Sequence, residues 1–100
     1  MAAYVIVNVT VHDAEAYKEY VRLAPPTIAA YGGRYLARAG NTEILEGDWK
    51  PNRLVILEFD SAERVKAWLD SPEYSAVKHL RHNNATSDMV VIEGLEHQPA

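Results

Sequence analysis

Residues 4–11 read Tyr4-Val5-Ile6-Val7-Asn8-Val9-Thr10-Val11, with a valine at every odd position from 5 to 11. β-Branched residues favour extended backbone, and successive side chains of a strand point to opposite faces of its sheet. The stretch therefore predicts a strand with one wholly apolar face. A second stretch, Arg53 to Phe59, is nearly all apolar, which is typical of a central strand.

A helical segment lies between these two strands. Asp13 is a suitable N-cap, and Gly32-Gly33 ends a series of apolar residues at helical spacing: Tyr17, Tyr20, Val21, Ala24, Ile28 and Tyr31. Pro25-Pro26 lies inside this series. Proline lacks an N–H group and disfavours helical backbone in the residue before it, so we expect a kink or a break there.

The remaining segments complete a βαββαβ order. Residues 34–39 read as a second strand, which residues 43–46 could continue, and residues 48–52 read as a turn. Ser61 and Ser71-Pro72 each cap a helical segment, and residues 88–93 form the last strand. The order predicts an α+β fold, a ferredoxin-like sandwich with an antiparallel four-stranded sheet in the order 4-1-3-2 and both helices on one face.

Length and composition limit the class of protein. The 100 residues suit one domain, which we place at residues 1–95, and the polar segment 96–100 reads as a flexible tail. Ten Lys and Arg against 14 Asp and Glu give a net charge of −4, which argues against a nucleic-acid partner. The sequence has no cysteine, no long apolar run and no signal-peptide pattern, so we expect a cytoplasmic protein with no membrane partner.

The two predicted faces of the sheet differ in composition. One face is uncharged and belongs under the helices: Val5, Val7, Val9, Tyr35, Ala37, Val55, Leu57, Phe59, Val90 and Ile92. The other is too apolar to face solvent, although it carries charges: Tyr4, Ile6, Asn8, Arg34, Leu36, Arg38, Leu54, Ile56, Glu58, Met89, Val91 and Glu93. We therefore expect a homodimer that packs through this second face. Arg38 would then need Glu58 or Glu93 as a partner, either as an interface ion pair or as a ligand anchor.

A small-molecule site is predicted between the helices and the sheet. Large aromatic residues on the helices face the small side chains of Ala37 and Ala39, which can leave a cleft: Tyr17, Tyr20, Tyr31, Trp68 and Tyr74. Arg81, seven positions after Tyr74, could hold a carboxylate while the phenols orient or protonate a substrate. The candidate ligand-binding residues are Arg38, Trp68, Tyr74 and Arg81, and the catalytic candidates are Glu58 as a base, Tyr74 and Arg81. Ordinary core packing, with Arg81 extending to water, is the alternative.

Metal and cofactor sites have little support in the sequence. His79 and His82 are spaced i, i+3 and could share a metal with Glu93 or His12, but a solvated helix face explains them better. We therefore expect no metal and no cofactor, haem included. Trp49 is either an exposed recognition residue or a ring folded over the hairpin or the dimer seam.

Several motifs together resemble the domain of unknown function 1330 family: Tyr17-Lys18-Glu19-Tyr20, residues 31–40, residues 45–49, Val55-Ile56-Leu57-Glu58-Phe59, and Ser71-Pro72-Glu73-Tyr74 with Leu80-Arg81. The resemblance runs from Tyr4 to Gly94 and implies a dimeric α+β barrel, in which two chains pair through their sheets. Pro25 departs from the pattern, in which one proline is typical.

The wider superfamily includes cofactor-free monooxygenases, muconolactone isomerase-like enzymes, chlorite dismutase-like haem proteins and stress-responsive barrels. By analogy, the resemblance implies one of two functions. The first is a cofactor-independent monooxygenase- or isomerase-like enzyme acting on a small acidic or aromatic substrate. The second is a non-catalytic homodimeric binding or stress-response module. Whether the protein is an enzyme stays open at this stage.

Overall fold

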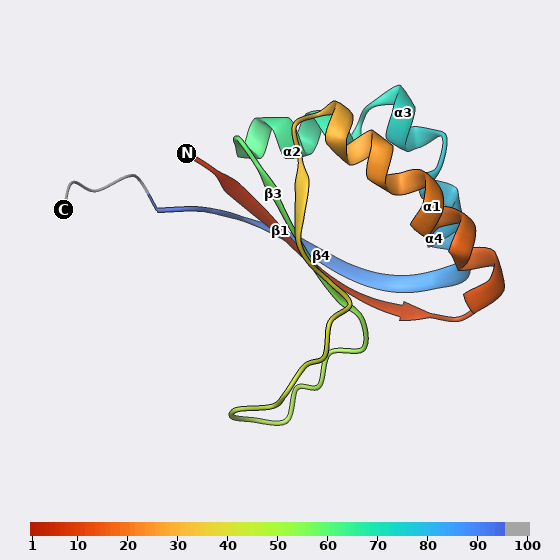
Figure 1. Ribbon diagram of the computed structural model, residues 1–100, viewed down its shortest axis with the longest axis vertical. Helices are drawn as coiled ribbons and strands as arrows, with labels where there is room; N and C mark the ends of the chain where they lie inside the picture. The colour runs from red at the N-terminus through yellow and green to blue at the C-terminus, as the bar shows by residue number, and fades with distance from the viewer. Residues whose placement is uncertain (96–100) are drawn as a thin grey trace.

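Strand β1 (Ala3–Val11) lies inside a four-stranded antiparallel sheet of order β2-β3-β1-β4, which a computed structural model shows covered on one face by helices (Figure 1). The structure describes residues 1–95; the tail predicted at residues 96–100 lies outside the described residues. The other elements are α1 (Ala14–Ala30), β2 (Arg34–Arg38), β3 (Leu54–Phe59), α2 (Ala62–Leu69), α3 (Pro72–Ser75), α4 (Lys78–Asn84) and β4 (Ala85–Glu93).

The predicted ferredoxin-like sandwich and its strand order are confirmed. Val5 of β1 lies opposite Leu57 of β3 and Val91 of β4, so β1 pairs on both sides. The core forms between this sheet and the helices, and its largest fully buried side chains are Trp68, Tyr74 and Phe59. The helical segment predicted to begin at Ser71-Pro72 forms two short helices, α3 and α4, which Ala76 and Val77 separate.

Helix α1 is continuous through both prolines, so of the predicted kink or break at Pro25-Pro26 the break is wrong. Its beginning and end are as expected: Asp13 accepts a hydrogen bond from the Ala16 amide, 3.1 Å away, and the helix ends before Gly32. Because Pro25 has no N–H group, the carbonyl of Val21 loses the helical partner it would otherwise have. A side chain from β2 takes that place, as described below.

The predicted faces of β4 are reversed. Val91 pairs with Val5 and Met89 pairs with Val7, so these two side chains lie on the helix-covered face. Val90 and Ile92 point to the other, open face and are 59% and 57% exposed. Residues 89–92 are apolar at every position, so the sequence does not show which of their side chains point toward the helices.

A β-bulge in β2 moves Arg38 to the helix-covered face. Tyr35 lies opposite Leu57, but Ala37 lies opposite Ile56 and Arg38 opposite Val55, so β2 carries one extra residue. The predicted pairing of Arg38 with Glu58 or Glu93 is therefore wrong. Glu58 lies on the open face and forms its ion pair with Arg34.

Residues 40–51 form an arm that extends away from the sheet (Figure 1). The arm contains no strand, so residues 43–46 do not continue β2. It exposes several large apolar side chains, including Leu45 at 90% and Trp49 at 63%. Long irregular loops of this kind are uncommon in small domains unless they serve a function.

Candidate functional site

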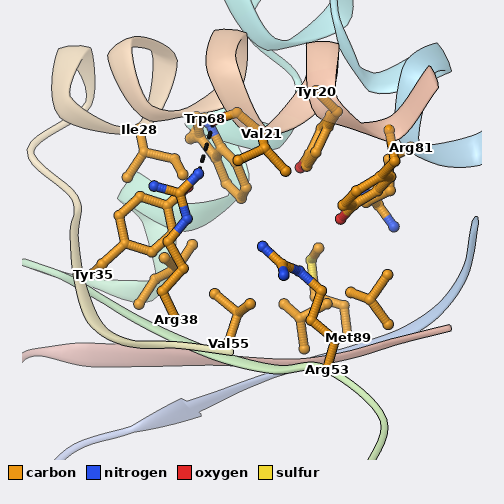
Figure 2. A pocket seen from close by; sticks show the side chains of 14 residues that line it. Tyr20, Val21, Ile28, Tyr35, Arg38, Arg53, Val55, Trp68, Arg81 and Met89 are labelled. Atoms are coloured by element: carbon orange, nitrogen blue, oxygen red, sulfur yellow. Dashed lines mark hydrogen bonds between the residues drawn. The ribbon is translucent and has the colours of Figure 1, made fainter. Parts of the chain in front are cut away.

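A pocket opens between α1 and the helix-covered face of the sheet (Figure 2). Its cavity volume is about 40 Å³, and it opens to solvent. Its apolar floor comes from the strands and includes Val7, Val9, Val55, Leu57 and Met89. Tyr17, Tyr20, Val21 and Ile28 of α1 line the opposite side. The lining, which combines apolar side chains with phenol and guanidinium groups, suits a small organic molecule.

Among residues 1–95, three arginines line this pocket, Arg38, Arg53 and Arg81, and no aspartate or glutamate does. The three ion pairs among residues 1–95, Lys18–Glu15, Arg22–Glu19 and Arg34–Glu58, involve none of them. A guanidinium group stays charged at any physiological pH. The pocket is therefore a locally cationic site in a chain with net charge −4.

Arg38 is held by the segment of α1 that precedes the prolines. Its Nη2 donates to the Val21 carbonyl at 2.8 Å, which is the oxygen that Pro25 cannot serve. Its guanidinium carbon also lies 4.6 Å from the centroid of the Tyr35 ring. Proline in the helix and the bulge in β2 thus fix one arginine at the pocket wall.

Arg81 is 8% exposed, so it does not extend to water. Its Nε donates to the Tyr74 hydroxyl at 3.1 Å, its Nη1 donates to Ser87, and its Nη2 lies 3.3 Å from Nε2 of His82. The Tyr74 hydroxyl lies 2.8 Å from the Tyr20 hydroxyl. This network connects the buried arginine to a phenol that lines the pocket.

Arg53 lies one residue before β3 and was not predicted as a site residue. Its carbonyl accepts a hydrogen bond from the Val9 amide at 2.9 Å, which extends the β1–β3 pairing to this position. Its side chain therefore follows the direction of Val55 and Leu57, toward the helices. The alternation 53, 55, 57, 59 is visible in the sequence and could have identified it.

The phenols of the pocket are weaker acids than a free tyrosine. Burial raises the pKa of Tyr20 far above its ordinary value of 10.0, and the adjacent Tyr74 hydroxyl adds to this rise. Burial also raises the pKa of Tyr17 against the opposing charges of Arg53 and Arg81, and that of Tyr35 against the charge of Arg38. All three are protonated at neutral pH, so they donate hydrogen bonds and do not act as bases.

These raised pKa values predict a loss of stability in alkali. The unfolded phenols ionise above about pH 10 while the folded ones stay protonated, so stability is unaffected below that pH and falls above it. Each such phenol removes up to about 1.4 kcal/mol per pH unit. Urea unfolding at about pH 8, 10 and 11 measures the fall. A Tyr20→Phe variant should fall less steeply, and an equal slope in both proteins would contradict the prediction.

The structure brings some of the predicted site residues together. Arg38, Trp68 and Arg81 line the pocket, whereas Tyr74 lies behind it, fully buried, with its ring centroid 4.4 Å from that of Trp68. Trp68 donates from Nε1 to the Thr27 hydroxyl at 3.1 Å. Glu58 points to the opposite face of the sheet, so its position does not suit a base in this pocket.

The two histidines of α4 do not form the start of a metal site. His79 and His82 are exposed, and the Arg81 guanidinium beside His82 repels a cation. Burial and the charges of Arg81 and Lys78 lower the pKa of His82. Across residues 1–95, no three histidine, aspartate or glutamate side chains lie close enough together to hold a metal ion. No helix in this part of the chain is long and apolar enough to cross a membrane.

Comparison with known proteins adds a family and several structural neighbours. The family model described as Domain of unknown function (DUF1330) matches residues 2–95. RPA0582, a protein of unknown function from Rhodopseudomonas palustris, is 20% identical with a TM-score of 0.76, over 96% of this chain and 84% of that one. No curated protein matches the sequence significantly.

Two further solved structures are similar to this chain. SnoaB from Streptomyces nogalater, described as a cofactor-independent oxygenase, is 17% identical with a TM-score of 0.65, over 99% of this chain and 98% of that one. A dimeric protein of unknown function with a ferredoxin-like fold from Bacteroides fragilis is 20% identical with a TM-score of 0.60, over 93% and 96%. At these identities the likeness shows a shared fold.

Proposed function

The chain belongs to the DUF1330 family, and because that family has no assigned activity, we propose a function from the pocket: the protein binds small acidic or aromatic molecules between α1 and the sheet. The observation that supports this proposal is the set of three arginines without a carboxylate partner in the pocket. Partly desolvated cations without a counter-charge are unfavourable, and each hydrogen bond to a charged group contributes about 1.5–3 kcal/mol. A bound organic anion supplies both the charge and the acceptors.

A thermal-shift series of matched ligands tests this proposal. Benzoate and phenylacetate are expected to raise the melting temperature by several degrees, and the uncharged benzamide and phenylacetamide by much less. A ligand at about ten times its Kd adds about 1.4 kcal/mol to the stability, which is enough for such a shift. Equal shifts for each acid and its neutral counterpart, or no shift with any of them, would count against anion binding.

Cofactor-independent oxygenation is the second candidate function. Among the groups that line the pocket, guanidinium and protonated phenol groups can stabilise an anion but cannot remove a proton. This favours a substrate that enters already ionised, and it disfavours an isomerisation that needs a protein base. A balanced reaction converts a ring CH₂ group and O₂ to C=O and water, with the substrate supplying the electrons. Oxygen uptake with a small, ionised hydroxyaromatic substrate that carries a ring CH₂ group, compared with the same mixture without protein, tests it.

We further propose that two chains pair through the open face of the sheet to form a dimeric α+β barrel. This face carries apolar side chains that are well exposed in the single chain, including Leu36 at 51%, Val90 at 59% and Ile92 at 57%. Tyr4, Ile6 and Ile56 lie among them in the pairing of β1 with β3 and β4. An exposed patch of this kind is typical of an interface. The neighbour from Bacteroides fragilis, which is described as dimeric with a ferredoxin-like fold, supports the pairing of two chains.

A further inference from the structure

Arg53 differs from the other two arginines of the pocket in its hydrogen bonding. All three side-chain nitrogens of Arg81 have partners, and Arg38 is bound to the Val21 carbonyl. In contrast, Nε of Arg53 is buried and has no hydrogen-bond partner in the described part of the chain. Figure 2 shows the Arg53 side chain rising from the sheet into the space below Tyr20. An unsatisfied buried donor on a charged group is costly, and a ligand acceptor at this position would remove that cost.

A second hydrogen-bond donor faces the same space. Arg81 donates to the Tyr74 hydroxyl, which leaves the Tyr74 proton available to the Tyr20 oxygen 2.8 Å away. In that arrangement the proton of Tyr20 is free to point into the pocket, toward an acceptor near Arg53. Either hydroxyl of this pair can donate to the other, and the arrangement in which Tyr74 donates leaves Tyr20 as a donor to the pocket.

The charged and titratable groups around Arg53 supply no negative charge from the pocket side. Tyr17 lies against it from α1, with the Tyr17 ring centroid 5.8 Å from the Arg53 guanidinium carbon. Arg38 and Arg81 complete the pocket side, and His82 lies beyond Arg81. On the outer side, Arg53 and Lys18 both line a second, more open recess. The Lys18 ammonium group forms an ion pair with Glu15 at 2.8 Å. Among the described residues, the polar groups that an anion in the pocket would contact are therefore cations and hydroxyl donors.

We propose that Arg53 anchors the charged oxygen of a small aromatic monoanion, with Tyr20 as the second donor, and that the pocket selects this ionised form over the neutral acid. The inference rests on the proposed function and gives it a ligand class and a specificity-determining residue. The aromatic ring would lie over the apolar floor formed by Val7, Val55 and Met89. Arg53 holds the anion by charge and by a hydrogen bond that the free protein does not make.

Spectroscopic titration of para-nitrophenol tests the selection, because its phenolate absorbs visible light and its neutral form does not. We expect the bound probe to ionise at lower pH than the free probe, by about one unit for a tenfold preference for the anion. The titration runs from about pH 5 to pH 9, so that it covers the ionisation of both the free and the bound probe. Para-nitrobenzoate as a competitor shows whether a carboxylate displaces the phenolate from the same position.

Arg53→Gln is expected to reduce the preference for the anion at least several-fold, toward parity. Arg64→Gln is the matched control, because it removes the same charge from an exposed position on α2 that does not line the pocket. It should leave the preference unchanged. If Arg53→Gln does not fold, Arg53→Lys keeps the charge but removes Nε, and an intermediate preference is expected.

The possible failures can be told apart. If the probe binds and its ionisation is unchanged, or if Arg53→Gln and Arg64→Gln behave alike, the Arg53 anchor is wrong although acid binding still stands. Failure of para-nitrophenol to bind, when acids of the thermal-shift series do bind, also overturns the anchor. If no acid of the thermal-shift series stabilises the protein and para-nitrophenol does not bind, the proposed function fails as well.

Discussion

A Val90→Glu/Ile92→Glu double variant is expected to remain monomeric at concentrations where the wild-type chain is a dimer. Both side chains lie on the open face of β4 and are more than half exposed in the single chain. Burying carboxylates there without partners would cost several kcal/mol, which shifts the equilibrium strongly toward the monomer. Size-exclusion chromatography with light scattering at micromolar concentration measures the change.

The matched control places the same two charges on exposed helix positions, Ala29→Glu and Ala67→Glu. Because α1 and α2 cover the opposite face of the sheet, this control should stay dimeric. A wild-type chain that is monomeric at micromolar concentration, or a β4 double variant that still dimerises, would show that the open face is not the interface.

Trp68→Ala is expected to lower the free energy of unfolding by about 3–5 kcal/mol, as deletion of large buried aromatic side chains does. Trp68 is 1% exposed, and its ring centroid lies 5.5 Å from that of Phe59 and 4.4 Å from that of Tyr74. The change also removes the hydrogen bond to Thr27. Small domains have only about 5–15 kcal/mol of stability, so much of the margin would be lost.

Trp49→Ala is the control for this experiment, because the chain's other tryptophan is 63% exposed on the arm. Urea unfolding of both variants at one chain concentration separates the two effects. A Trp49→Ala loss within about 0.5 kcal/mol would place Trp49 outside any stabilising contact. If Trp68→Ala lost no more than Trp49→Ala, the packing described for the core would be wrong.

The framework of the fold was predictable because each element carries a local signal. Alternating valines mark β1, and Asp13, Ser61 and Ser71 each accept the hydrogen bond expected of an N-cap. The βαββαβ order then leaves few topologies, and the observed sheet is the expected one.

The errors fall where local signals are absent or are overridden by tertiary contacts. The apolar run of β4 does not show which residues face the helices, and no residue type in β2 indicates a bulge. Pro25 and Pro26 disfavour a helix locally, yet α1 packs along its length on the core, and Arg38 satisfies the Val21 carbonyl. Packing outweighs propensity at this point.

The candidate site was predictable in its position but only partly in its residues. Arg38 lines the pocket through the bulge, which the sequence did not show, and Glu58 was predicted as a base from its charge alone although it faces away. Arg53 was missed even though its alternation with Val55 and Leu57 is visible. Arg53 begins the apolar stretch predicted as a strand, and its side chain lines the pocket.

Anion binding at the pocket arginines can be observed directly in the NMR signals of arginine Nε–Hε groups during titration with benzoate. The six arginines provide an internal comparison, because Arg38, Arg53 and Arg81 line the pocket while Arg22, Arg34 and Arg64 do not. We expect saturable shifts confined to the pocket arginines, with the largest at Arg53, and no such shifts with benzamide. Shifts spread equally over all six arginines, or no saturable shift at Arg53, would contradict the proposed site.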